Sequence, residues 1–343
     1  MVLSPFFGYI CTVKKNSVKI LVIRFSSIGD VVLTTPIIRC LKEQLEGDVE
    51  IHYLIKEQYQ SIVKNNPNVF KVHTIQKSTN EIVDTLKKEQ FDYVVDLHKN
   101  LRSKRVVKNL KALSFSFDKV NFQKFLLTTF KINKLPKIHI VDRYFGAVKA
   151  LGIKNDNKGL DYFIPSNDDV SMNTLPTSHQ KKYIAFAIGA QHFTKRLPTH
   201  KIISICKKIN QPIILLGGKE DEITATEIKK EVGELVFNAC GKYNLNQSAS
   251  LVKQANTLIT HDTGLMHIAA ALNVQTISVW GNTVPDFGMY PYFPNQPEKF
   301  TIVENKNINC RPCSKIGYDK CPKKHFKCME DIDEETIVKS LKI

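Results

Sequence analysis

A carboxylate stands just after the first strand-like segment of the chain, in a turn that also contains serine and glycine. The apolar run 20–23 is followed by a polar turn over 24–30, and apolar residues at helical spacing then predict a helix over 31–45. Ligands of parallel α/β sheets bind beyond the carboxyl ends of the strands. Asp30 is therefore a candidate general base at the mouth of a cleft. Its simpler role is to cap the helix, and the local pattern alone favours the cap.

A second strand–turn–helix unit, nearer the end of the chain, is suited to a diphosphate. The strand-like run 257–260 leads into a turn and then into a helix that we expect from about Leu265. Free N–H groups at a helix start bind anions, and a glycine lets the ligand approach the backbone closely. Capping of the helix and packing against the sheet are simpler roles for single members of the unit. These members are Asp262, Thr263, Gly264 and His267.

Two further loops follow apolar runs in the same half of the chain. The loop 188–198 offers basic residues, and a lysine there can neutralise the charge of a departing phosphate. The loop 217–222 carries acidic residues, and a carboxylate in this position can hydrogen-bond a ribose diol. An exposed surface loop and an acidic helix start are the simpler alternatives. Together the loops predict a site for a nucleotide with a diphosphate. The candidate residues are Thr194, Lys195, Arg196, Glu220 and Asp221.

Strand-like and helix-like segments alternate along the whole chain, which predicts parallel sheets with helices on both faces. A polar stretch with two prolines separates two halves of similar size, so we expect two Rossmann-like domains that face each other across a cleft. The expected strands are 20–23, 49–55, 69–75, 93–97, 183–188, 212–216, 235–237, 257–260 and 276–280. The expected divisions are an N-terminal extension over 1–18, a first domain over 19–165, a linker over 166–181, a second domain over 182–328 and a C-terminal helix within 329–343.

Composition and charge limit the classes of function. The chain has 343 residues and a formal net charge of +16. A basic excess of this size predicts an acidic partner, such as nucleic acid, an anionic membrane surface or a phosphorylated substrate. No apolar run approaches the length of about 20 residues that a transmembrane helix needs, and residues 1–13 lack the basic start of a signal peptide. The eight cysteines have no regular pairing pattern, which fits a reducing compartment. We therefore expect a cytoplasmic protein.

Residues 99–137 combine positive charge with aromatic side chains. This segment has eleven Lys or Arg residues and a single acidic residue, Asp118, with five phenylalanines between them. Basic segments with aromatic anchors bind lipid headgroups or phosphates. A nucleic-acid surface has a similar composition, but no nucleic-acid-binding motif accompanies the segment, so we expect no nucleic acid as a partner. A solvated pair of basic helices with phenylalanine in the core is the simpler alternative.

Four cysteines near the end of the chain have a spacing that permits a metal site. Four thiolates can hold a structural zinc ion in a tetrahedral site, although this spacing is less regular than that of paired zinc knuckles. Structural zinc and free thiols in the core both stay open from the sequence. The four residues are Cys310, Cys313, Cys321 and Cys328.

Five segments, in order, resemble those of one enzyme family. The run 23–31 (IRFSSIGDV) resembles the opening signature of the family 9 glycosyltransferases, the ADP-heptose:lipopolysaccharide heptosyltransferases. The run 261–271 (HDTGLMHIAAA) resembles their nucleotide-sugar signature. The resemblance extends from about Lys19 to the C-terminus, although Leu197 stands where the family often has an aromatic residue. The other matching segments are 93–97 with 100–103 (YVVDL and NLRS), 141–144 (VDRY) and 195–198 (KRLP).

The resemblance implies a GT-B fold and an inverting reaction that requires no metal or other cofactor. It implies that the first domain binds the acceptor, that the second binds an ADP-heptose-like donor, and that the C-terminal helix packs back onto the first domain. Asp30 matches the family's catalytic base, which would take a proton from the acceptor hydroxyl as that oxygen attacks the anomeric carbon. Lys195 and backbone N–H groups at the start of the 265–272 helix would stabilise the charge on the departing diphosphate.

The resemblance also assigns the remaining site residues and the partners. The acceptor that it implies is an anionic glycolipid of the lipopolysaccharide core or lipid A type, met at the cytoplasmic face of the inner membrane. Two other functions stay open: a GT-B nucleotide-sugar epimerase, and a non-catalytic basic protein that binds membrane or nucleic acid. The implied donor-site residues are Thr194, Glu220, Asp221, Asp262, Thr263, Gly264, Leu265 and His267, and the implied acceptor-site residues are Ser27, Gly29, Lys99 and Arg102.

Overall fold

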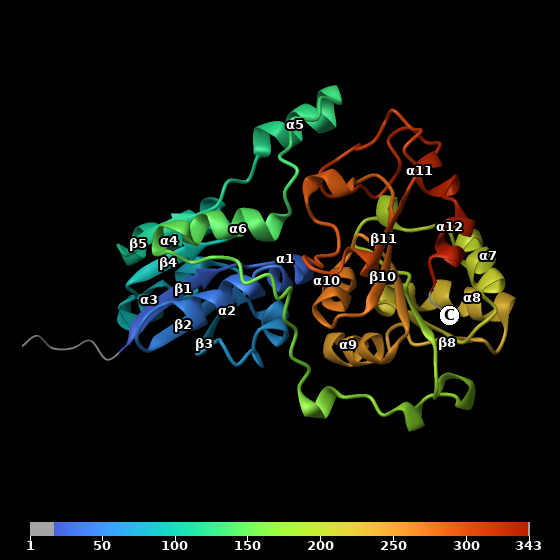
Figure 1. Cartoon of the computed structure of the whole chain (residues 1–343), viewed down its shortest axis with the longest axis horizontal. Coiled ribbons are helices and arrows are strands. Elements are labelled where there is room, and N and C mark those ends of the chain that lie inside the picture. The colour runs from blue at the N-terminus through green and yellow to red at the C-terminus, as the bar shows by residue number, and fades with distance from the viewer. Residues whose placement is uncertain (1–16, 342–343) are drawn as a thin grey trace, which may run out of the picture.

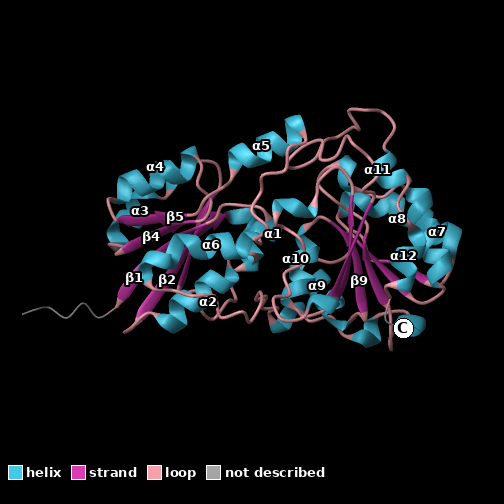
Figure 2. Ribbon diagram, turned by 45° about the horizontal axis from the view of Figure 1, so that its top comes forward, coloured by secondary structure: helices cyan, strands magenta, loops and turns pink. Residues whose placement is uncertain are grey.

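The computed structural model describes residues 17–341, so nearly all of the predicted N-terminal extension lies outside the described residues. The chain forms two parallel β-sheets, each in its own half of the molecule (Figure 1). Figure 2 shows helices on both sides of each sheet. Within residues 17–341, no helix has both the length and the apolar character that a bilayer crossing requires.

The first sheet has five strands in the spatial order β3-β2-β1-β4-β5. Alternate residues of a strand face opposite sides of a sheet. Ile20 therefore packs with α2 and α6, whereas Leu21 packs with α3 and α4. The strands are β1 (Val18–Ile23), β2 (Val49–Lys56), β3 (Lys71–Ile75), β4 (Tyr93–Asp96) and β5 (Leu113–Ser116). The helices are α1 (Ile28–Val32), α2 (Thr35–Gln44), α3 (Val83–Glu89), α4 (Leu101–Leu110), α5 (Asn121–Phe130) and α6 (Ile140–Val148).

The second sheet has six strands in the order β11-β10-β9-β6-β7-β8, again all parallel. Phe186 packs on the side of α7 and α8, and Ala185 on the side of α9 and α10. The strands are β6 (Ile184–Ala187), β7 (Ile213–Leu216), β8 (Val236–Asn238), β9 (Thr257–His261), β10 (Gln275–Trp280) and β11 (Phe300–Glu304). The helices are α7 (Thr199–Ile209), α8 (Glu222–Val232), α9 (Leu245–Gln254), α10 (Gly264–Ala271), α11 (Lys327–Glu330) and α12 (Glu334–Lys339).

The helix predicted over 31–45 is two helices. α1 ends at Val32 and α2 begins at Thr35. The hydroxyl of Thr34 donates a hydrogen bond to the carbonyl oxygen of Val31 at 2.7 Å, and Pro36 has no N–H to continue the ladder. The break leaves α1 as a short unit that belongs to the turn after β1.

Two edge strands escaped the sequence pattern. β5 has four residues, none of them fully buried, inside the basic segment 99–137. β11 has the mixed sequence FTIVE, with only Val303 buried, and forms one edge of the second sheet. Neither strand contains the continuous apolar run that marks a buried parallel strand, so periodicity does not separate them from loops.

Two segments join the halves. Residues 152–183 contain no strand or α-helix, only three short 3₁₀ turns, and connect β-sheet to β-sheet along one side of the molecule (Figure 1). Residues 285–296 return from the second half to the first, where the carbonyl oxygen of Gly288 accepts from the N–H of Ile140 at 2.8 Å. Tyr292 and Phe293 are buried in the core of the first half.

The expectation that the C-terminal helix packs back onto the first domain is wrong. α12 packs against α7 of the second half. Ile337 is fully buried in the core that α7 and α8 cover, and Glu334 lies 2.9 Å from Lys201 and 2.6 Å from the hydroxyl of Ser204. α12 therefore packs on the second half through both apolar and charged side chains. The segment that returns to the first half is 285–296.

Candidate active site

A cleft of about 940 Å³ lies between the two halves, where strands of both sheets end. The first half contributes the turn after β1 and parts of the segment 117–124, and the second half contributes the loops after β6, β7 and β9. Most of the predicted site residues line this cleft. They are Ser27, Gly29, Asp30, Lys195, Glu220, Asp221, Asp262, Thr263, Gly264, Leu265 and His267.

The first turns of α1 and α10 meet inside the cleft. A Cβ atom at Gly29 would lie 2.4 Å from Cδ2 of His267, and one at Gly264 would lie 2.6 Å from Cγ2 of Ile28. Both distances are shorter than atoms tolerate, so the two helices approach this closely because each has a glycine at the contact. The contact places the turn that carries Asp30 beside the start of α10.

Both carboxylate oxygens of Asp30 are held. Oδ1 lies 2.5 Å from Nη2 of Arg24, and Oδ2 accepts a hydrogen bond from Oγ of Ser27 at 2.9 Å. Burial disfavours the charged carboxylate, but the charge of Arg24 and the hydrogen bonds from Ser27 outweigh burial, so the pKa of Asp30 is lowered from its ordinary value. The backbone N–H of Ser27 also donates to Oδ2, at 3.2 Å. Asp30 therefore closes the first turn of α1 and presents an ionised carboxylate to the cleft.

On the side of the cleft formed by the second half, Asp262 fixes the side chain of Lys195. Its Nζ lies 2.6 Å from Oδ2 of Asp262, and the same oxygen accepts from the hydroxyl of Thr283 at 2.9 Å. Thr263 is the N-cap residue of α10, and its side chain does not cap the helix. A positive side chain and the free end of a helix thus line the same part of the cleft, an arrangement that binds anions.

His267 is a buried, neutral histidine one turn into α10. It is 2% exposed, and its Nδ1 has no hydrogen-bond partner in residues 17–341. Burial lowers the pKa of His267 to about 4. The ring packs on Gly29 and lines the cleft, so His267 supports the contact between the halves as well as the site.

The two acids after β7 have different environments. Asp221 is buried, accepts from the N–H of Gly218 at 2.9 Å and pairs with Arg196 at 3.2 Å. A Cβ at Gly189 would lie 2.1 Å from the Asp221 carboxylate, so this side chain fastens the loops after β6 and β7 together. Glu220 is exposed and faces the cleft. Of the two, Glu220 is the one with oxygens available to a ligand.

Three of the predicted site residues do not line the cleft. Thr194 is buried, and its hydroxyl donates to the carbonyl oxygen of Tyr318 at 3.0 Å. The Nζ of Lys99 donates to the carbonyl oxygen of Phe117 at 2.7 Å, and Arg102 is exposed on α4. Lys99 therefore orders the segment beside the cleft, and Thr194 orders the loop that carries Lys195.

Several cleft residues were not singled out from the sequence. Arg24 follows β1 directly, and Lys119 and Lys124 come from the basic segment, which was recognised only as a whole. Burial and the nearby charge of Arg143 lower the pKa of Lys124 to about 8. Which lysines of a basic segment face the cleft depends on the orientation of α5, which charge patterning does not reveal.

The four C-terminal cysteines are free thiols and do not form a four-sulfur site. With Zn–S distances of about 2.3 Å, a tetrahedral site holds its sulfur atoms about 3.8 Å apart. In the described part of the chain, no three of these sulfurs lie within 4.8 Å of one another. Cys328 packs in the core of the second half, and Sγ of Cys310 lies 3.9 Å from Nε2 of His325. As placed, these residues fit free thiols better than a zinc site.

Known structures share this architecture along nearly the whole chain. A glycosyltransferase of family 9 from Veillonella parvula superimposes with a TM-score of 0.73 at 22% identity, covering 94% of this chain and 95% of that one. The ADP-heptose LPS heptosyltransferase II of Escherichia coli gives a TM-score of 0.71 at 18% identity, covering 94% and 97%. The predicted GT-B fold, with two parallel sheets facing a cleft, is confirmed.

The sequence comparisons point to the same family. The lipopolysaccharide heptosyltransferase 1 of Campylobacter coli is 26% identical over 353 aligned positions, which cover 94% of this chain and 98% of that protein. The sequence profile described as "Glycosyltransferase family 9 (heptosyltransferase)" matches residues 80–324. That match spans most of the chain and includes the loops that hold Lys195, Glu220 and Asp262. The chain therefore belongs to glycosyltransferase family 9, the heptosyltransferase family.

Proposed function

We propose that this chain transfers heptose, or a closely related sugar, from an ADP-sugar to an anionic lipopolysaccharide core or lipid A-type acceptor, with inversion at the anomeric carbon. The observation that carries this proposal is the pairing of two sites across one cleft. An ionised carboxylate, Asp30, comes from the first half, and a fixed lysine, Lys195, with the start of α10 comes from the second. The relatives in the family are lipopolysaccharide heptosyltransferases.

Asp30 is the proposed general base. As an acceptor hydroxyl oxygen attacks the anomeric carbon, its proton passes to Asp30 and the bond from that carbon to the diphosphate oxygen breaks. Attack from the face opposite the diphosphate gives inversion. The lowered pKa keeps Asp30 ionised, and Arg24 holds one carboxylate oxygen in a fixed orientation.

The leaving ADP carries away negative charge, which the second half stabilises. Lys195 supplies a positive charge, and the backbone N–H groups of Thr263, Gly264 and Leu265 supply aligned donors. The transfer then needs no metal ion for charge stabilisation, so unchanged kcat in the presence of a chelator is expected. Glu220 is the proposed ribose ligand, because both carboxylate oxygens of the neighbouring Asp221 already accept hydrogen bonds, from Gly218 and Arg196.

The acceptor is proposed to enter beside α5. Lys119, Lys124 and Lys315 line this part of the cleft and suit the phosphates or carboxylates of a core oligosaccharide. Lys99 and Arg102, which the resemblance assigns to the acceptor, lie outside the cleft lining. Lys99 acts on the acceptor only through the segment that it orders, and Arg102 is exposed on α4.

α5 is also the proposed contact with an anionic membrane surface, at the cytoplasmic face of the inner membrane. Figure 1 shows α5 projecting from the first half, above the space between the halves. Leu127 is its one buried residue, and it packs on Val284 and Phe287 of the second half. The helix also exposes Phe122, Phe125 and Phe130, and Lys131 and Lys134 follow it. Exposed aromatic residues next to lysines suit a layer of anionic headgroups.

The test of transfer is turnover by the Asp30→Asn variant with ADP-heptose and a heptose-deficient core lipid supplied. Loss of activity in a folded variant is expected, and near-normal turnover would remove Asp30 from the role of base. Product analysis with donor alone separates transfer from epimerisation, since an epimerase converts the donor sugar without an acceptor. A rise in Tm with ADP is expected from binding to the folded state, and no rise at saturating ADP would favour a non-catalytic binding protein.

The membrane contact has its own test. Vesicles with anionic lipid should retain the wild-type protein, and Phe122→Ser with Phe130→Ser should weaken this binding. Ile223→Ser is the matched control, since Ile223 is 84% exposed on α8 in the other half. Equal binding by all three proteins, or binding that does not respond to salt, would contradict the proposal.

A further inference from the structure

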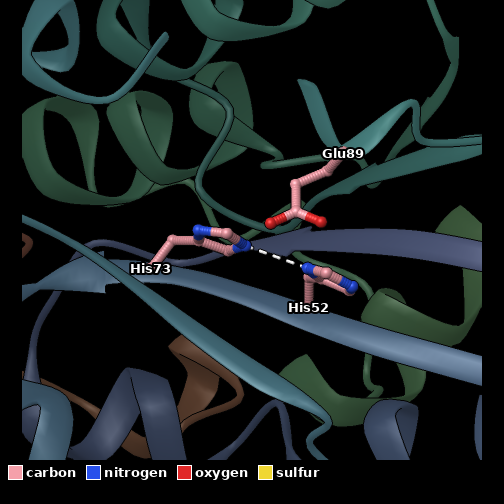
Figure 3. Close-up of side chains that lie close together, drawn as sticks. All are labelled: His52, His73 and Glu89. Carbon is pink, nitrogen blue, oxygen red and sulfur yellow. Dashed lines mark hydrogen bonds between the residues drawn. The ribbon is translucent and has the colours of Figure 1, made fainter. Parts of the chain in front are cut away.

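Two histidines and a glutamate meet in the first half of the molecule. His52 of β2 and His73 of β3 are neighbours in the sheet, and Glu89 at the end of α3 points toward them (Figure 3). One ligand atom from each side chain lies within 4.8 Å of the other two, and no other such group of His, Cys, Asp or Glu occurs in residues 17–341. None of the three lines the central cleft, so the proposed sugar transfer leaves the group unexplained.

The two imidazole rings are arranged as metal ligands would be. Nδ1 of His52 and Nε2 of His73 share a hydrogen bond at 2.9 Å (Figure 3). An ion that displaces its proton would hold the two nitrogens about 3.3 Å apart, the separation that a tetrahedral site with Zn–N distances near 2.0 Å requires. The rings are 0% and 3% exposed. Neutral imidazole is the form of histidine that binds metal ions.

The far side of His52 has the partner that a ligating histidine uses. Its Nε2 lies 3.6 Å from Oε2 of Glu50, is buried, and makes no hydrogen bond in the described chain. Metal-bound histidines commonly direct their second ring nitrogen to a carboxylate, which fixes the tautomer that leaves the first nitrogen free. With the ring proton on Nε2, Nδ1 of His52 faces His73 and Glu89 with a lone pair.

We propose that His52, His73 and Glu89 bind one divalent transition-metal ion, with Zn²⁺ as the ion that two imidazoles and a carboxylate suit best. The ion would join three separate elements. β3 is an edge strand of the first sheet, and the ion would tie it to β2 and to the last turn of α3. The role is structural, since the site lies apart from the cleft, and the proposal does not depend on the proposed function.

Lys71 is the competitor for this site. Its Nζ lies 2.6 Å from Oε1 of Glu89, whereas Lys19 is more distant from the same carboxylate, at 3.9 Å. The side chain of Lys71 is 49% exposed and can turn into water, so an incoming ion displaces it without leaving a buried charge. Removal of Lys71 should therefore strengthen metal binding, which a purely structural ion pair does not predict.

The experiment is a titration of the full-length, chelator-stripped protein with Zn²⁺ against a chromophoric competitor. Glu89→Gln and His73→Asn should each weaken binding at this site by about tenfold or more, and Lys71→Gln should strengthen it. Glu227→Gln, which alters an exposed glutamate of α8, is the matched control and should bind as the wild type does. Circular dichroism checks that each variant is folded.

Co²⁺ spectra distinguish this site from the four C-terminal cysteines. A His₂-carboxylate site gives d–d bands without the intense near-ultraviolet charge transfer of thiolate ligands, and the Glu89→Gln variant should lose these bands. Unchanged affinity in Glu89→Gln and His73→Asn, no gain in Lys71→Gln, or spectra that show thiolate ligands alone would each overturn the proposal.

Discussion

Arg24 and Asp30 form an ion pair with an Nη2–Oδ1 distance of 2.5 Å, on the wall of a cleft that otherwise contains many positive side chains. Arg24 is held from behind, since its Nη1 donates to the carbonyl oxygen of Leu97 at 2.6 Å. The carboxylate that we assign as the base thus depends on a buried cation for its ionisation and its orientation.

Replacement of Arg24 by methionine should move the acidic limb of the kcat/KM profile. A base with a lowered pKa works above that pKa and stops working as the pH falls through it. Loss of the Arg24 charge should raise the pKa of Asp30, because the effect of burial is then no longer offset by a nearby positive charge. As the pH falls, activity should therefore disappear at a higher pH than in the wild type. Activity at the pH optimum should also fall, by up to about 100-fold, through misorientation of the carboxylate. Arg105→Met, at an exposed arginine of α4 outside the cleft lining, should leave the profile in place.

Gly29→Ala should destabilise the protein by about 1–3 kcal/mol, because its Cβ would overlap the ring of His267. Urea unfolding measures the change. In the double variant with His267→Ala, part of the lost stability should be regained, since the overlapping ring is gone. Gly146→Ala is the matched control: Gly146 lies in α6 with nothing near its missing Cβ, so alanine there should stabilise by about 0.5–1 kcal/mol. Additive losses in the double variant would contradict the contact.

Lys195→Met should lower kcat by about 100- to 1000-fold, as expected for a group that stabilises charge on a leaving group. Asp262→Asn should lower kcat less, because the lysine remains but loses the carboxylate that fixes it at 2.6 Å. Lys207→Met, on the surface of α7, serves as the control. Steady-state kinetics with saturating donor measure the three variants, and equal kcat for Lys195→Met and Lys207→Met would remove Lys195 from the mechanism.

Ile337→Ala should lower the free energy of unfolding by about 2–5 kcal/mol, since the side chain is fully buried in the core that α7 and α8 cover. Ile223→Ala, at an exposed isoleucine of α8, should change it by less than about 0.5 kcal/mol. Because α12 packs on α7 and away from the cleft, kcat of the folded Ile337→Ala protein should match that of the wild type. A loss of kcat without a loss of stability would argue that α12 acts on the site.

Strands with continuous apolar runs were predictable, because burial on both faces leaves a clear pattern. β1, β2, β7 and β9 all lie where that pattern places them. β5 and β11 were not predicted, since neither contains a continuous apolar run. The split between α1 and α2 was readable in part from Pro36. The hydroxyl of Thr34 that completes the turn also contacts Oη of Tyr53 at 2.9 Å, a tertiary contact that local sequence does not reveal.

The site was predictable where a residue's role follows from its place after a strand. Asp30, Lys195 and Asp262 reach the cleft for that reason. The different roles of Glu220 and Asp221 could not be predicted from the sequence. Two adjacent acids at a helix start look alike, and only the structure shows that Arg196 and Gly218 contact Asp221. The approach of Lys124 to the cleft and the contact of α12 with α7 also depend on the orientation of a helix, which local sequence does not specify.

The segment 285–296 suggests how the molecule would behave if its chain were cut. Tyr292 and Phe293 sit in the core of the first half, although their segment follows β10 of the second half. A protease nick at the exposed residues Asn173 and Thr174 would leave this anchorage intact, along with the contact between Gly29 and His267. The two fragments should therefore remain one particle, and their separate expression offers a route to a split enzyme that reassembles.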